Sequence, residues 1–135
     1  MFKFLSPNSG YNLSKHALVL NQNGEHEVKI AKLIALIGVL AMGGILIYAF
    51  ATGDFQAEGS QLMSMPWGIV SLVDLYVGFA LFAIWIAYRE PSLWRAIIWI
   101  VLLMVLGFFI GSLYTLLALH NSDEDWQVFW NGRSP

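Results

Sequence analysis

The chain has 135 residues, enough for one domain, and its formal net charge of −2 gives no basic face for nucleic acid. Hydrophobic residues make up 58% and charged residues 12% of the chain, the opposite of a disordered composition. There is no cysteine, which excludes disulfides, iron–sulfur clusters and cysteine nucleophiles.

The first 28 residues form a polar leader. Pro7 and Gly10 belong to a turn-rich cluster, and Asn23-Gly24 is a second turn signal. We therefore divide the chain into a polar leader (1–28), a transmembrane domain (29–120) and a short acidic, aromatic tail (121–135).

Three long apolar runs follow the leader. Residues 33–52 and 96–119 contain no charged residue, and residues 66–88 contain only Asp74. At a rise of 1.5 Å per residue, each run can cross the ~30 Å hydrocarbon core of a bilayer. The first run starts about 30 residues from Met1 and is longer than the apolar core of a signal peptide. The sequence therefore predicts an all-α integral membrane protein with three transmembrane helices, the first of which is retained.

Prolines mark two of the predicted helix boundaries. Residues 53–65 are predicted to be a loop, and Pro66 suits the first turn of the second helix because its missing N–H would be unsatisfied there anyway. Pro91 should end the second helix, and Ser92 can cap the third.

The basic residues predict an orientation, because short loops rich in Lys and Arg stay in the cytoplasm. They lie before or at the start of the first run, in the second loop and in the tail, and the first loop has none: Lys3, Lys15, Lys29, Lys32, Arg89, Arg95 and Arg133. We expect the N-terminus and the second loop to face the cytoplasm, and the first loop and the tail to face outside. The expected location is the bacterial cytoplasmic membrane or a membrane derived from it.

Asp74 is the single charge inside a predicted span, eight residues after Pro66 and about 12 Å into the membrane. The residues at helical spacing from it are Trp67, Ser71, Gly78, Leu81 and Trp85. This spacing predicts that Asp74 faces other helices. No basic residue lies at matching depth, so Asp74 either bonds a hydroxyl of Ser71, Tyr48 or Tyr114 or pairs with another chain. A neutral packing acid is favoured over a proton or ion relay, because relays need several ionisable groups.

Gly107 and Gly111 form a GxxxG on the third predicted helix. With Leu103 or Met104, Tyr114 and Ala118 they make a smooth stripe along which helix backbones can approach closely. Such a stripe serves either packing within the chain or docking to another subunit, and the pattern leaves both open.

The sequence contains no recognisable catalytic or metal-binding constellation. A membrane b-type haem needs two facing histidines inside the bilayer, whereas His16 and His26 lie in the leader and His120 ends the third run. The acidic residues 123–125 lack the spacing of a calcium loop. We therefore predict a non-enzymatic protein without catalytic, cofactor-binding or metal-binding residues and without a cofactor.

Short motifs along the apolar region resemble a family of small membrane proteins of bacteria and plants that is catalogued only as a domain of unknown function. They are Gly53-Asp54-Phe55, Glu58-Gly59-Ser60, Pro66-Trp67-Gly68, Asp74-Leu75-Tyr76, Gly78-Phe79, Trp85-Ile86 and Arg89-Glu90, followed by the Gly107 and Tyr114 region. The resemblance covers about residues 30–133, with the leader as an extension. It implies three membrane helices and no established activity, and it indicates that the neighbourhood of Asp74 and Tyr76 matters.

Two functions fit these features. The first is an accessory or assembly subunit docked to a larger membrane complex, for example an energy-converting or photosynthetic one. The second is a small oligomeric transporter or channel that uses Asp74 as an intramembrane acid. Both need the lipid bilayer and either a membrane-protein partner or self-association. The candidate interaction or structural residues are Asp74, Ser71, Tyr76, Gly78, Gly107 and Gly111.

Overall fold

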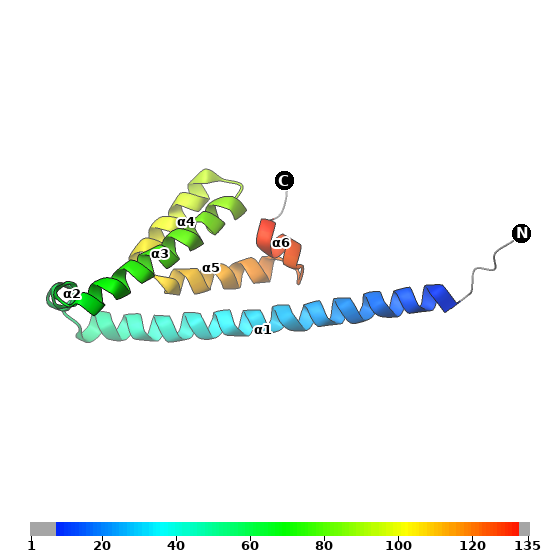
Figure 1. Cartoon of the computed structure of the whole chain (residues 1–135), viewed down its shortest axis with the longest axis horizontal. Helices are drawn as coiled ribbons and strands as arrows, with labels where there is room; N and C mark the ends of the chain where they lie inside the picture. The colour runs from blue at the N-terminus through cyan, green and yellow to red at the C-terminus, as the bar shows by residue number, and fades with distance from the viewer. Residues whose placement is uncertain (1–7, 133–135) are drawn as a thin grey trace, which may run out of the picture.

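The computed structural model describes residues 8–132 and is all-α over that range (Figure 1). The described residues form six helices: α1 (Asn8–Thr52), α2 (Phe55–Ser64), α3 (Pro66–Arg89), α4 (Leu93–Leu106), α5 (Phe108–Asn121) and α6 (Trp126–Asn131). The predicted all-α class is confirmed, but the division into helices differs from the prediction at three places.

The first difference is in the leader. α1 is a single helix of 45 residues, about 68 Å long at 1.5 Å per residue, and it projects well beyond the other helices at its N-terminal end (Figure 1). The turn predicted at Asn23-Gly24 is wrong, because both residues lie inside this helix. A Cβ at Gly24 would meet no other atom within 4 Å, so this glycine is neither a turn residue nor a contact residue.

The second difference is in the first loop, which contains the short helix α2. Asp54 caps this helix, because its side chain accepts hydrogen bonds from the backbone N–H groups of Gln56 and Ala57, both at 3.1 Å. α2 then packs against the start of α3, where the carbonyl of Leu62 lies against Gly68 without room for a side chain. Pro66 occupies the first turn of α3, as predicted.

The third difference is a break in the third apolar run. At Gly107 the backbone adopts φ +63° and ψ −149°, a conformation that L residues rarely adopt. α4 ends there and α5 starts, so the predicted continuous helix over residues 96–119 is wrong. Each piece has 14 residues and spans about 21 Å, which is less than a ~30 Å hydrocarbon core.

The helices fold back on one another twice. α3 ends at Arg89, as the position of Pro91 predicts, and α4 returns alongside it. Ser92 occupies the cap position of α4 but makes no capping bond with its side chain. α5 then runs antiparallel to α1, and α6 closes the end near α3 and α5 (Figure 1).

Two groups of buried side chains hold this arrangement. The first joins α3, α4 and α5 through Phe79, Ile86, Ala96, Leu103, Ile110 and Tyr114. The second joins α1, α5 and α6 through Val28, Ala35, Ala118, Leu119 and Phe129. Burial of these side chains against each other fixes the positions of α5 and α6, and therefore of the tail.

Most of the apolar surface stays exposed. Two helical stretches are long and apolar enough to cross a membrane, Gly24–Thr52 and Pro66–Arg89. Only 6% and 11% of their most apolar windows are buried, whereas the core helix of a soluble protein is mostly buried. α4 and α5 are also apolar, but each is shorter than a full span.

Candidate functional site

Asp74 lies on the exposed surface of α3. Trp67 and Leu81, seven residues before and after it, share its face of the helix and are 82% and 65% exposed. Val70, one turn before Asp74, is exposed as well. The expectation that Asp74 faces other helices of this chain is therefore wrong. We call this surface, formed by Trp67, Val70, Asp74 and Leu81, the Asp74 face.

The hydroxyl groups expected to bond Asp74 have other positions or partners. Ser71 donates its hydrogen bond to the carbonyl of Trp67 at 3.0 Å, and Tyr114 donates to Glu90 at 2.9 Å. Tyr48 is exposed on α1. Within residues 8–132 the carboxylate of Asp74 has no hydrogen bond or ion pair. The face is thus an apolar surface with one acid that the described part of the chain leaves unpaired.

The other predicted residues are distributed over separate contacts. The ring of Tyr76 lies edge-on to Phe79 with centroids 5.7 Å apart, and Gly78 faces the ring of Phe108. Gly111 is buried, and a Cβ there would lie 2.8 Å from Phe108. Because the helix breaks at Gly107, Gly107 and Gly111 do not share one continuous helical face, so the predicted stripe is wrong as a continuous one, although its members Gly111, Tyr114 and Ala118 are all buried on α5.

A polar cluster that the sequence analysis did not single out lies where α3 ends. Arg89 and Glu90 are each only 11% exposed in their side chains, and Tyr114 of α5 lies between them. Tyr114 donates to Oε1 of Glu90 at 2.9 Å and accepts from Arg89 at 3.3 Å. Arg95 reaches the other oxygen of Glu90 at 3.8 Å. We call these residues the Arg89–Glu90–Tyr114 cluster.

Aromatic rings enclose this cluster and link it to the tail. Trp85 and Trp99 both meet Tyr114 edge-on, with centroids 5.5 and 5.2 Å apart. Trp85 also contacts Phe129 of α6. Buried charged groups are stable only when they are paired and hydrogen-bonded, and Arg89 and Glu90 meet both conditions. The cluster therefore fastens α3, α5 and α6 together.

The same contacts correct the predicted topology. Arg89 donates from Nε to the backbone carbonyl of Phe129 at 2.8 Å, and Tyr88 donates to Asn131 at 3.4 Å. The second loop and the tail are therefore at the same end of the molecule. A hydrocarbon core of ~30 Å cannot separate atoms 2.8 Å apart, so the prediction that loop and tail face opposite sides is wrong.

A metal site finds no support among the described residues, since residues 8–132 contain no group of three His, Asp or Glu side chains that could hold an ion. The acidic residues of the tail adopt a tight turn instead. Asp123 and Glu124 both have positive φ, at 50° and 68°, and Asp125 caps α6 by accepting from the N–H of Gln127 at 2.7 Å.

Comparison with known proteins places the chain in a family. No curated protein and no solved structure matches it. A family model does match, over residues 18–129, so the match begins inside the predicted leader rather than near residue 30. It thus includes α1 from residue 18 onwards, α2, the Asp74 face, the Arg89–Glu90–Tyr114 cluster and most of α6. The chain belongs to the family described as "Protein of unknown function (DUF1475)".

Proposed function

We propose that the protein is an integral membrane protein in which α1 and α3 span the bilayer and the α4–α5 pair enters and leaves it on one side. The length and exposure of the two apolar helices support this arrangement. The break at Gly107 lies against the middle of α3, because a Cβ added at Gly107 would be 3.4 Å from the ring of Phe79. Its backbone groups are bonded, because Gly107 donates to Leu103 at 2.8 Å and accepts from Ile110 at 3.0 Å. Irregular backbone is tolerated in a bilayer under such conditions.

The charge distribution supports the same arrangement. The tail and the second loop lie at the same end of the molecule, and the segment 53–65 connects α1 and α3 at the opposite end. It contains no Lys or Arg, and all seven basic residues of the chain lie outside it. By the positive-inside rule, the leader, the second loop and the tail face the cytoplasm and α2 faces outside.

Within the membrane, the protein acts as a non-enzymatic accessory or assembly subunit that docks to a larger membrane protein through the Asp74 face. The carrying observation is the exposed, unpaired Asp74 among exposed apolar side chains. Ionisable groups inside a membrane are expensive and normally pair with one another or with polar groups of a neighbouring helix. Because residues 8–132 supply no such group, the partner presents a basic or hydrogen-bond-donating side chain at the depth of Asp74.

Co-purification in mild detergent tests the docking surface. Asp74→Leu should insert and fold as the native chain does but lose the larger subunits, whereas Glu58→Leu removes an exposed acid outside the spans and should keep them. Asp74→Asn identifies the pairing group, since loss in this variant indicates a cation on the partner and retention indicates a hydrogen bond. Unchanged recovery of partners with Asp74→Leu would refute docking through this face.

The same experiment decides the alternative function. A transporter or channel built from copies of this chain would purify as a homo-oligomer free of larger subunits, and Asp74→Leu would abolish ion movement in reconstituted vesicles. That pair of results would overturn the accessory role.

A further inference from the structure

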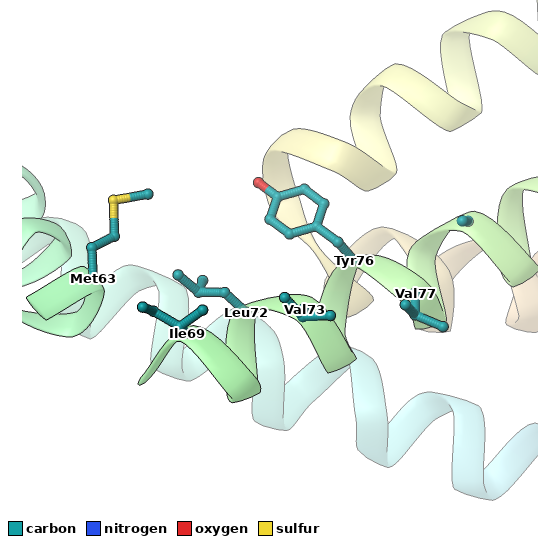
Figure 2. A pocket seen from close by; sticks show the side chains of 7 residues that line it. Met63, Ile69, Leu72, Val73, Tyr76 and Val77 are labelled. Atoms are coloured by element: carbon teal, nitrogen blue, oxygen red, sulfur yellow. The ribbon is translucent and has the colours of Figure 1, made fainter. Parts of the chain in front are cut away.

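A long groove runs from α2 along the outer surface of α3 (Figure 2). It consists of two hollows of about 700 and 670 Å³ that share Met63, Leu72 and Tyr76. The first is lined only by apolar residues and Tyr76, and it extends along α3 from Ile69 to Ala80, about 16 Å by helix rise. The second lies under α2 and is lined in part by Gln56 and Ser60. The groove is thus polar at one end and apolar along the rest.

Two polar side chains of the groove lack partners in the described chain. Tyr76 lies ten residues after Pro66, about 15 Å along α3, and its ring leans back towards Met63 so that the hydroxyl points along the groove (Figure 2). Neither this hydroxyl nor the amide of Gln56 makes a side-chain hydrogen bond within residues 8–132. In hydrocarbon no water is present to accept a hydrogen bond from the phenol, so a molecule bound in the groove has to supply the acceptor.

The polarity of the groove matches its expected depth in the membrane. α2 connects the outer ends of α1 and α3, so Gln56 and Ser60 lie at the headgroup layer while the stretch from Ile69 to Ala80 lies among acyl chains. An occupant therefore has a polar head, a hydrogen-bond acceptor within reach of the Tyr76 hydroxyl and a long apolar tail. The backbone carbonyls of a partner helix, which is about 10–12 Å wide with side chains, are bonded internally, so only a polar side chain of such a helix could supply this acceptor, whereas a lipid carries one beside its head.

Charge restricts the head of this occupant. The segment 53–65 carries Asp54 and Glu58 and no basic residue, so its field is negative. We propose that the groove holds one molecule of a zwitterionic glycerophospholipid, with an ester carbonyl accepting from Tyr76 and one acyl chain along Leu72, Val73 and Ala80. Anionic glycerophospholipids bind it more weakly.

Native mass spectrometry of the delipidated protein, titrated separately with phosphatidylethanolamine and phosphatidylglycerol, tests this inference. The first lipid should bind with a stoichiometry of one and more tightly than the second. Tyr76→Phe should weaken its binding about five- to tenfold, the scale of one lost hydrogen bond. Val73→Trp should fill the groove and abolish the bound lipid.

Matched variants separate the groove from general lipid adhesion. Val101 of α4 is 55% exposed against 58% for Val73, and Tyr48 of α1 is an exposed tyrosine outside the groove. Val101→Trp and Tyr48→Phe should bind lipid as the native chain does, and so should Asp74→Leu, which makes this outcome independent of the docking surface. The proposal would be overturned if Tyr76→Phe and Val73→Trp bound lipid as tightly as the native chain, or if the native chain preferred phosphatidylglycerol. It would also be overturned if the native chain were a dimer that Val73→Trp dissociates.

Discussion

Gly107→Ala distinguishes a broken third apolar run from a continuous one by the sign of its effect on stability. At φ +63° and ψ −149° an alanine is strained, which costs about 1–3 kcal/mol of unfolding free energy. Steric contact adds little, because the new Cβ would lie 3.4 Å from the nearest ring atom, on Phe79. In a continuous helix the same substitution would instead stabilise by about 0.8–1.0 kcal/mol, the propensity difference between glycine and alanine. The two structures therefore differ by about 2–4 kcal/mol in the expected effect.

The measurement is a reversible unfolding titration in mixed detergent micelles, followed by circular dichroism. Gly44→Ala is the control, because Gly44 lies inside α1 and a Cβ there would meet nothing within 4 Å. It should stabilise by roughly the helix propensity difference. We expect Gly107→Ala to move in the opposite direction from this control. If both variants gain stability by the same amount, the helix is continuous through Gly107 and the argument for an α4–α5 hairpin fails.

Three further predictions concern packing, the polar cluster and topology. Gly38→Leu should destabilise by about 1–3 kcal/mol through overpacking, since even a Cβ would lie 2.6 Å from the hydroxyl oxygen of Ser112. Gly44→Leu should not destabilise, and equal effects of the two variants in the unfolding titration would show that α5 does not pack against this face of α1. Tyr114→Phe should cost about 1–3 kcal/mol because it leaves Glu90 and Arg89 short of a partner, and the exposed Tyr88→Phe should cost less; the same titration checks the order. A reporter active only in the cytoplasm should be active when fused after Pro135 and silent when inserted in the segment 53–65, and the reverse pattern would exclude the proposed orientation.

Helix boundaries set by proline were predictable from the sequence. Pro66 favours the start of a helix and Pro91 favours the end of one, because a proline lacks the N–H that a helix interior requires. The apolar runs likewise predicted the two helical stretches, in α1 and α3, that are long and apolar enough to cross a membrane. These features are local, so they need no knowledge of which helices pack together.

The break at Gly107 and the polar cluster were not predictable in this way. One glycine in an uncharged run is compatible with a straight membrane helix. The helix breaks because α4 packs against α3 while α5 packs against α1, and the sequence does not reveal these contacts. Tyr114 lies 24 residues from Glu90, and nothing in its apolar surroundings indicates that it bonds a carboxylate. The position of the tail depended on both, so the sequence predicted wrongly that the tail and the second loop face opposite sides.

Two acids, Asp74 in α3 and Glu90 directly after it, differ in whether the described chain supplies a partner. In the proposed arrangement Glu90 lies at the boundary of the bilayer, where a charge costs least, yet it pairs with Arg89 and Arg95 and accepts a hydrogen bond from Tyr114. In the same arrangement Asp74 lies within the span, where an unpaired acid costs most, yet no group within residues 8–132 bonds it. Internal stability alone would favour replacing Asp74 with an apolar residue like its exposed neighbours Trp67, Val70 and Leu81. Its presence is therefore better explained by a group outside this chain, which is why Asp74→Leu is expected to abolish partner binding and not folding.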